Sequence, residues 1–104
     1  MATFLPIAVR ELHWTQPGGA CGKVRLALGT PVQSSNGMSW ACPMAADGLF
    51  DNLPEMHGVD SWQALILALS VLKMIVKDKI EKGWTFHWPT PDCGAVDLEY
   101  IFGF

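Results

Sequence analysis

The segment 57–83 constrains the fold more than any other part of the chain, because it specifies one long helix that is apolar on nearly every side. Asp60 followed by Gln63 forms a capping-box pattern at its start, and Gly83 suits its end. Before the last turn, the polar positions form one narrow stripe made of Gln63, Ser70, Lys73 and Lys77. A helix with so little polar surface must be covered on more than one side.

Steps of 100° per residue divide the apolar positions of this helix into two faces. We expect the face with the larger side chains to pack on a sheet, with Trp62 at the centre of the core. That face consists of Trp62, Leu65, Ile66, Leu69, Leu72, Val76 and Ile80. The second face consists of Ala64, Leu67, Ala68, Val71 and Ile75. We expect loops of this chain, a twofold mate or another protein to cover it.

Strand signals lie on both sides of the helix. Alternating or extended patterns occur at 7–14, 23–30, 38–44, 84–88 and 96–104. Turn clusters at 16–19, 34–37 and 89–94 separate the segments on each side of the helix. The order of three strands, one helix and two strands predicts an α+β fold, with an antiparallel sheet of about five strands and the helix across one face. Residues 1–104 are expected to form one domain.

Composition narrows the classes of partner. Half of the 104 residues are hydrophobic, five are Trp, and the formal net charge is −3. A packed globule is therefore expected, and nucleic acid is not expected as a partner because phosphate binding needs clustered Lys and Arg.

Cysteine usage and hydropathy point to the cytoplasm. Cys21, Cys42 and Cys93 are an odd set without a Cys-x-x-Cys pair, which favours buried, reduced thiols. The N-terminal segment lacks the basic region of a secretory signal. Residues 64–76 are too short for a membrane span and include Lys73, so no membrane association is expected.

The residues that could carry chemistry form no recognisable set. His13, His57, His87 and the three cysteines lack the short spacing of zinc ligands, so we expect no metal and no cofactor. Cys42 could act as a nucleophile only with a His base that the sequence does not place. No nucleophile-elbow, zinc-protease or phosphate-binding motif is present, and an enzyme is not expected.

The aromatic row Trp84, Phe86 and Trp88 has two interpretations. Rings at every second position of a strand could form a stacking platform for bases or sugars. They could equally form part of the core against Trp62. The acidic charge of the chain favours the core.

The segment 45–58 is the strongest candidate for a binding loop. It joins strand to helix and combines the acidic residues Asp47, Asp51 and Glu55 with the apolar anchor Phe50. A solvated connector is the alternative, and the sequence leaves both open. Asp97 and Glu99 would add a second acidic patch if the last strand lay at a sheet edge.

Two stretches carry a resemblance to other proteins. Trp40-Ala-Cys42-Pro43, followed by the sequence GVDSWQALILAL at 58–69, resembles a family of small uncharacterised bacterial proteins. Its members share a strand that ends in Cys-Pro and a helix that starts Gly-x-Asp-x-x-Gln-Ala-Leu. The match falls mostly within 38–72. The resemblance implies a one-helix α+β fold with no known activity, and it carries over no functional residue.

These features together predict a non-enzymatic bacterial binding protein, most concretely an immunity or antitoxin-like inhibitor of a protein toxin. Acidic patches can neutralise a basic surface and speed association with it. Three alternatives remain. The chain could be a homodimeric structural or accessory protein, a viral inhibitor of a host defence nuclease, or a small enzyme that uses His57 or His87 with a carboxylate.

Overall fold

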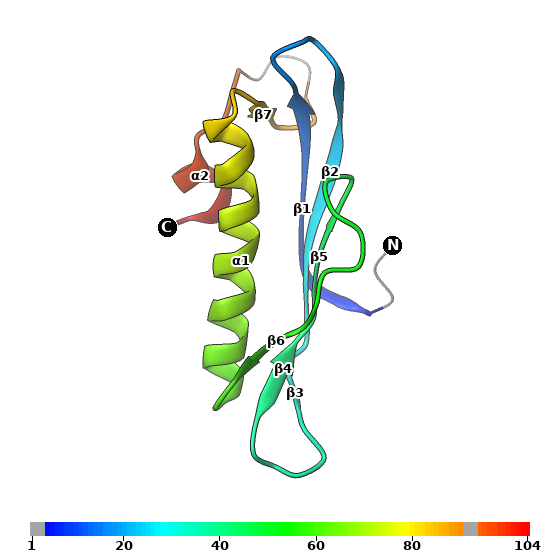
Figure 1. Ribbon diagram of the computed structural model, residues 1–104, viewed down its shortest axis with the longest axis vertical. Helices are drawn as coiled ribbons and strands as arrows, with labels where there is room; N and C mark the ends of the chain where they lie inside the picture. The colour runs from blue at the N-terminus through cyan, green and yellow to red at the C-terminus, as the bar shows by residue number, and fades with distance from the viewer. Residues whose placement is uncertain (1–3, 91–93) are drawn as a thin grey trace.

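The computed structural model describes residues 4–90 and 94–104, which form two layers (Figure 1). The strands lie in one layer and the helices in the other, within an elongated shape of 48 × 25 × 22 Å. The elements are β1 (Pro6–Thr15), β2 (Cys21–Gly29), β3 (Val32–Gln33), β4 (Trp40–Cys42), β5 (Met44–Asp47), β6 (Met56–Gly58), α1 (Ser61–Glu81), β7 (Thr85–His87) and α2 (Leu98–Phe102). The α+β class with antiparallel strands and one main helix is confirmed.

The strands form two sheets, so the prediction of one sheet of about five strands is wrong. The first sheet has the order β5-β2-β1-β7 and the second has the order β3-β4-β6. The segment 38–44 divides at Pro43, because β4 pairs with β3 and β6 whereas β5 pairs with β2. Pro43 has no N–H for a strand ladder. Its carbonyl instead accepts a hydrogen bond from the backbone N–H of Gly29 (2.9 Å).

Both predicted ends of α1 are confirmed. The Asp60 carboxylate accepts a hydrogen bond from the Gln63 N–H (2.7 Å), and Gln63 Oε1 accepts one from the Val59 N–H (2.7 Å). The first bond satisfies an N–H group of the first turn that has no partner within the helix, and the second ties Val59, the residue before the cap, to that turn. Gly83 follows the helix with φ of +93°, a conformation that suits glycine. Within the described ranges, neither helix is apolar over enough length to cross a membrane.

The side of α1 that meets the sheets carries small residues. Ala64, Ala68, Leu72 and Val76 are buried at successive helix turns. Trp62 is 76% exposed, so its predicted place at the core centre is wrong. Strand β6 lies so close to the start of α1 that a Cβ on Gly58 would stand 2.5 Å from the Ala64 nitrogen. A large side chain cannot face a strand at that separation.

The burial of α1 also corrects the predicted partner face. Ala64 and Ala68 are fully buried inside this chain, so they cannot lie in an interface with a twofold mate. Leu67, Val71 and Ile75 are half-buried beside the core stripe. The chain therefore covers much of this face with its own strands, which the sequence pattern left open.

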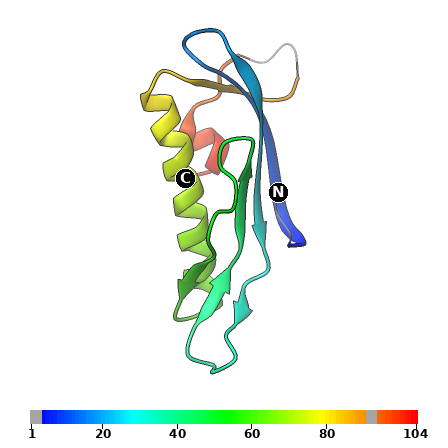
Figure 2. The same ribbon diagram turned by 45° about the vertical axis from the view of Figure 1, so that its right-hand side comes forward.

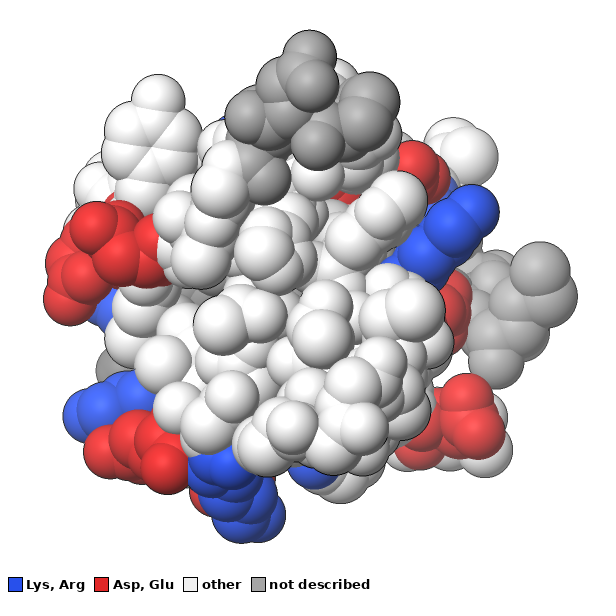
Figure 3. All heavy atoms as spheres, turned by 90° about the horizontal axis from the view of Figure 1, so that it is seen from above, with Lys and Arg blue, Asp and Glu red and all other residues white. Residues whose placement is uncertain are grey.

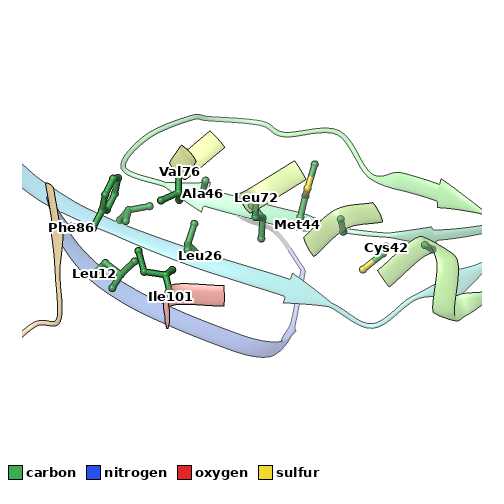
Figure 4. Packing of buried hydrophobic residues seen from close by; sticks show 12 residues of the cluster. Leu12, Leu26, Cys42, Met44, Ala46, Leu72, Val76, Phe86 and Ile101 are labelled. Carbon is green, nitrogen blue, oxygen red and sulfur yellow. The ribbon is translucent and has the colours of Figure 1, made fainter. Parts of the chain in front are cut away.

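The core lies between the four-stranded sheet and the two helices (Figure 4). Leu12, Phe86 and Ile101 lie at one end of the cluster and Cys42 at the other. Phe86 is 1% exposed and packs in the core as predicted. Trp84 and Trp88 are only partly buried against it, so the aromatic row forms no continuous exposed platform.

The predicted last strand at 96–104 is wrong, because its central part forms α2. Asp97 caps this helix by accepting a hydrogen bond from the Tyr100 N–H (3.0 Å), and Gly103 ends it with φ of +81°. Alternation over so few residues does not distinguish a strand from a short helix. The Asp and Gly at its two ends are the sequence signals for the helix.

Candidate functional site

The loop 48–55 runs back beside β5 and is held at its start by backbone contacts (Figure 2). The N–H groups of Leu49 and Phe50 both donate to the Ala46 carbonyl (3.0 Å each). Gly48 has φ of +103°, and a Cβ there would stand 2.0 Å from the Lys23 carbonyl oxygen. Only glycine fits so close to β2. The start of the loop, residues 48–50, is therefore fixed against the sheet edge.

Beside this loop lies a surface groove of about 510 Å³, which we call the acidic groove. Its lining residues are Phe4, Val32, Pro43, Met44, Ala45, Asp47, Phe50, Asn52, Leu53 and Glu55. The structure thus brings Asp47, Phe50 and Glu55 to one place, and Asp51 is exposed in the same loop. The groove combines carboxylates with apolar side chains.

The carboxylates of this loop differ in their surroundings. Asp47 lies opposite Arg25 in the β2–β5 register, so a cation stands across the strand from it. Asp51 and Glu55 are exposed, and neither forms an ion pair within the described ranges. Of the two carboxylates that line the acidic groove, Glu55 is therefore the one without a cation across the strand, and Asp51 adds charge from the same loop outside the lining.

Phe50 lies where the acidic groove meets the C-terminal end of α1. The Lys79 Nζ is 5.5 Å from the centroid of the Phe50 ring and 5.0 Å from that of the Trp84 ring. An ammonium over an aromatic face is held by the ring quadrupole. Phe50 stays 43% exposed, so its free side is available to a partner.

The second acidic pair lies elsewhere. Asp97 caps α2 and Glu99 lies in its first turn, and the Ile101 carbonyl of this helix accepts a hydrogen bond from Arg10 of β1 (2.7 Å). The acidic groove lies at β5, the other edge of the same sheet. The six predicted partner-binding residues therefore form two separate surfaces, and the Asp97 carboxylate is already engaged as a helix cap.

The cysteines divide by environment. Cys42 is buried, and its thiol donates to the Gly29 carbonyl (3.5 Å). Burial raises the pKa of the Cys42 thiol, and the nearby charge of Glu55 raises it further. This environment opposes the nucleophilic thiolate. Cys21 is exposed, contrary to the expectation of buried thiols, and Cys93 lies outside the described residues.

His13 and His87 lie opposite each other in the β1–β7 register. Cross-strand neighbours in such a pair have Cβ atoms about 5 Å apart. In the described part of the chain, no group of three His, Cys, Asp or Glu side chains is arranged to hold a metal ion.

The end of the molecule that carries the β1–β2 turn has an uncharged centre (Figure 3). The charged side chains in this view stand around its rim. Trp14 and Trp84 pack together near this end with ring centroids 4.7 Å apart, and Pro17 in the turn lies over Gly83. The turn thus covers the C-terminal end of α1, and we assign this end a structural role.

Sequence similarity identifies the family. Residues 8–95 match a family described as Domain of unknown function (DUF6968). The chain belongs to this family. The match includes α1, both sheets except the first two residues of β1, and every lining residue of the acidic groove except Phe4, and it ends before α2. No curated protein and no solved structure matches the chain.

Proposed function

We propose that this DUF6968 protein is a non-enzymatic binding protein that inhibits a protein partner through the acidic groove. The observation that carries the proposal is the convergence of Asp47, Phe50 and Glu55 on one groove beside a loop fixed by its backbone. A cytoplasmic bacterial toxin with a basic active surface is the partner class that this chemistry fits best.

Charge would govern how fast such a partner is captured. Within residues 4–90 and 94–104, Asp51 and Glu55 form no ion pair, and both are exposed to solvent. Unpaired carboxylates attract a basic surface over about one Debye length, roughly 10 Å at 0.1 M salt. Their main effect is on the association rate.

Phe50 would govern how long the partner stays bound. Aromatic side chains that are partly exposed beside a groove are frequent energetic centres of interfaces. The fixed start of the loop reduces the ordering that binding would otherwise require. Loss of the Phe50 ring is therefore expected to raise the dissociation rate.

The test is co-expression with the product of the neighbouring toxin-like reading frame, scored by growth. The informative variant is the pair Asp51→Lys and Glu55→Lys, because both side chains are exposed and neither makes an ion pair in the described residues. The matched control is Glu81→Lys with Glu99→Lys, which changes the net charge equally at exposed helix positions. Circular dichroism establishes that both pairs fold.

We expect wild type and the control pair to rescue growth and the loop pair to fail. In binding measurements, the loop pair should slow association more at low salt than at high salt. Full rescue by the folded loop pair would exclude the acidic groove as the binding site. If only the control pair failed to rescue growth, the partner would bind at the surface around Glu99. If wild type failed to rescue growth, inhibition of that partner would be excluded.

A further inference from the structure

The edge of the four-stranded sheet opposite the acidic groove is open. Strand β7 pairs with β1 only at residues 13–15. Residues 6–12 of β1 have no strand partner on that side within the described part of the chain. Ile7 is 56% exposed and Val9 is 44% exposed on this open stretch. An unpaired apolar edge is a template for another strand.

The space between this edge and α1 is also open. A groove of about 210 Å³ lies there, lined by Ala8 and Leu26 from the sheet and by Leu69, Leu72 and Phe102 from the helices. Ile66 and Trp62 continue the Leu69 stripe toward the start of α1, since they precede it by three and seven residues. Both are exposed. Apolar side chains therefore flank this edge on both faces of the sheet. Val9 lies on the outer face, because it alternates with Arg10 and Leu12, and Ile66 and Trp62 lie on the helix side.

We propose that a second copy of this chain covers this side, with the two β1 strands paired antiparallel about a twofold axis at Val9. The pairing would join two four-stranded sheets into one. Regular β1–β2 pairing begins at Ala8, after an irregularity between Pro6 and Ala8, so Val9 lies in the regular part of the edge. A twofold axis at Arg10 or Glu11 would place like charges directly opposite, which is unfavourable.

The C-terminal segment lies beside the open edge. Arg10 and Lys73 hold α2 and Phe104 there by hydrogen bonds to the Ile101 and Phe104 carbonyls. A twofold axis at the edge would bring the same segment of the second copy to the other end of the paired strands. Each copy would then cover the side that the other leaves open.

The exposed area is of the size that a dimer needs. The exposed apolar side chains around this edge, counted over both faces of the sheet, are Ile7, Val9, Trp62, Ile66 and Phe104. Each leaves on the order of 100 Å² in contact with water, or roughly 500 Å² together. The strand backbone and α2 would bring this toward the roughly 800 Å² per copy that stable interfaces bury. The acidic groove lies at the other sheet edge, so this dimer leaves it free.

Sedimentation equilibrium between about 1 and 200 μM tests the proposal, because protein association in this range corresponds to about 5–8 kcal/mol. Wild type should reach twice the 11.4 kDa mass of one chain. Val9→Lys would place two like charges at the axis and should weaken association about 100-fold or more. The matched control is Val32→Lys, at a valine that is 60% exposed on β3 in the other sheet. This control should dimerise as wild type does.

A second measurement does not depend on the folding of the lysine variant. Facing residues of an antiparallel pair have Cα atoms about 4.5–5.5 Å apart, within the range of a disulfide. In a background of Cys21→Ser and Cys93→Ser, Val9→Cys should form a covalent dimer on mild oxidation, and Val32→Cys should not. A monomeric wild type at 200 μM, or equal cross-linking of both variants, would overturn the proposal. Loss of dimer in Val32→Lys instead of Val9→Lys would also overturn it.

Discussion

Side-chain size decides which residues of α1 face the strands. Ala64 and Ala68 meet the close approach of β6, whereas Trp62 is left outside. Hydrophobicity alone ranks Trp62 above alanine for the core, and this ranking produced the incorrect prediction. The available volume beside Gly58 overrides it, because interiors are filled to crystal-like density.

Two aromatic substitutions distinguish a buried position from an exposed one by their effect on the unfolding free energy. Phe86→Ala removes a ring that is 1% exposed and should cost about 3–5 kcal/mol of unfolding free energy. Trp62→Ala removes a ring that is 76% exposed and should cost less than about 1 kcal/mol. Urea melts followed by circular dichroism at 1 μM, the lowest concentration of the sedimentation range, measure both. Equal losses would show that the assignment of the two faces is incorrect.

The packing of α1 on β6 is the contact between elements that sets the position of the helix. Strand β6 leads into α1 through Gly58. A Cβ at this position would stand 2.5 Å from the Ala64 nitrogen, so the hydrogen of glycine is all that fits. The capping residues Asp60 and Gln63 follow directly and fix the direction of the first turn. A small change at Gly58 must therefore displace either the strand or the whole helix.

Gly58→Ala tests this contact. The added methyl would lie 2.5 Å from the Ala64 nitrogen, and overpacking of this kind costs about 1–3 kcal/mol. Gly18→Ala is the control, because nothing lies within 4 Å of its added Cβ. Thermal melts at equal protein concentration should show a lower Tm for Gly58→Ala and a change of less than about 0.5 kcal/mol for Gly18→Ala. Equal Tm values for the two variants would contradict the close approach.

At the scale of the whole molecule, the two edges of the main sheet differ in character. The β5 edge carries a fixed loop with carboxylates, and the β1 edge presents apolar side chains beside an open groove. The proposed inhibitor surface and the proposed dimer surface thus lie on opposite sides and could operate together.

Association of two copies would make stability depend on concentration. Mass action favours the folded dimer over two unfolded chains, and each tenfold rise in concentration adds about 1.4 kcal/mol per dimer. For a domain of this size, this corresponds to an increase in Tm of roughly 3–5 °C. Calorimetry at 10 and 100 μM should show that increase for wild type and not for Val9→Lys. A Tm that is independent of concentration in wild type would count against the dimer.

Local sequence determined the elements whose signals are short-range. The capping residues and Gly83 fixed the ends of α1, and the 16–19 and 34–37 turns fixed two strand reversals. The acidic loop was also recognisable, because a connecting segment that contains Asp, Glu, Asn, Gly and Pro is predicted to lie at the surface. Asp97 and Gly103 are also sequence signals for the two ends of α2, but the alternating apolar pattern between them predicted a strand instead.

Tertiary contacts decided the rest. Pro43 divides one apparent strand between two sheets, and only strand pairing shows which partner each half takes. The space beside Gly58 is small, so it admits alanines and excludes Trp62. Strand β7 is short and pairs only with residues 13–15 of β1, so the rest of that edge has no strand partner in the described part of the chain. The physical reason is that burial and pairing depend on residues far apart in the chain, whereas helix ends and turns depend on neighbours within a few residues.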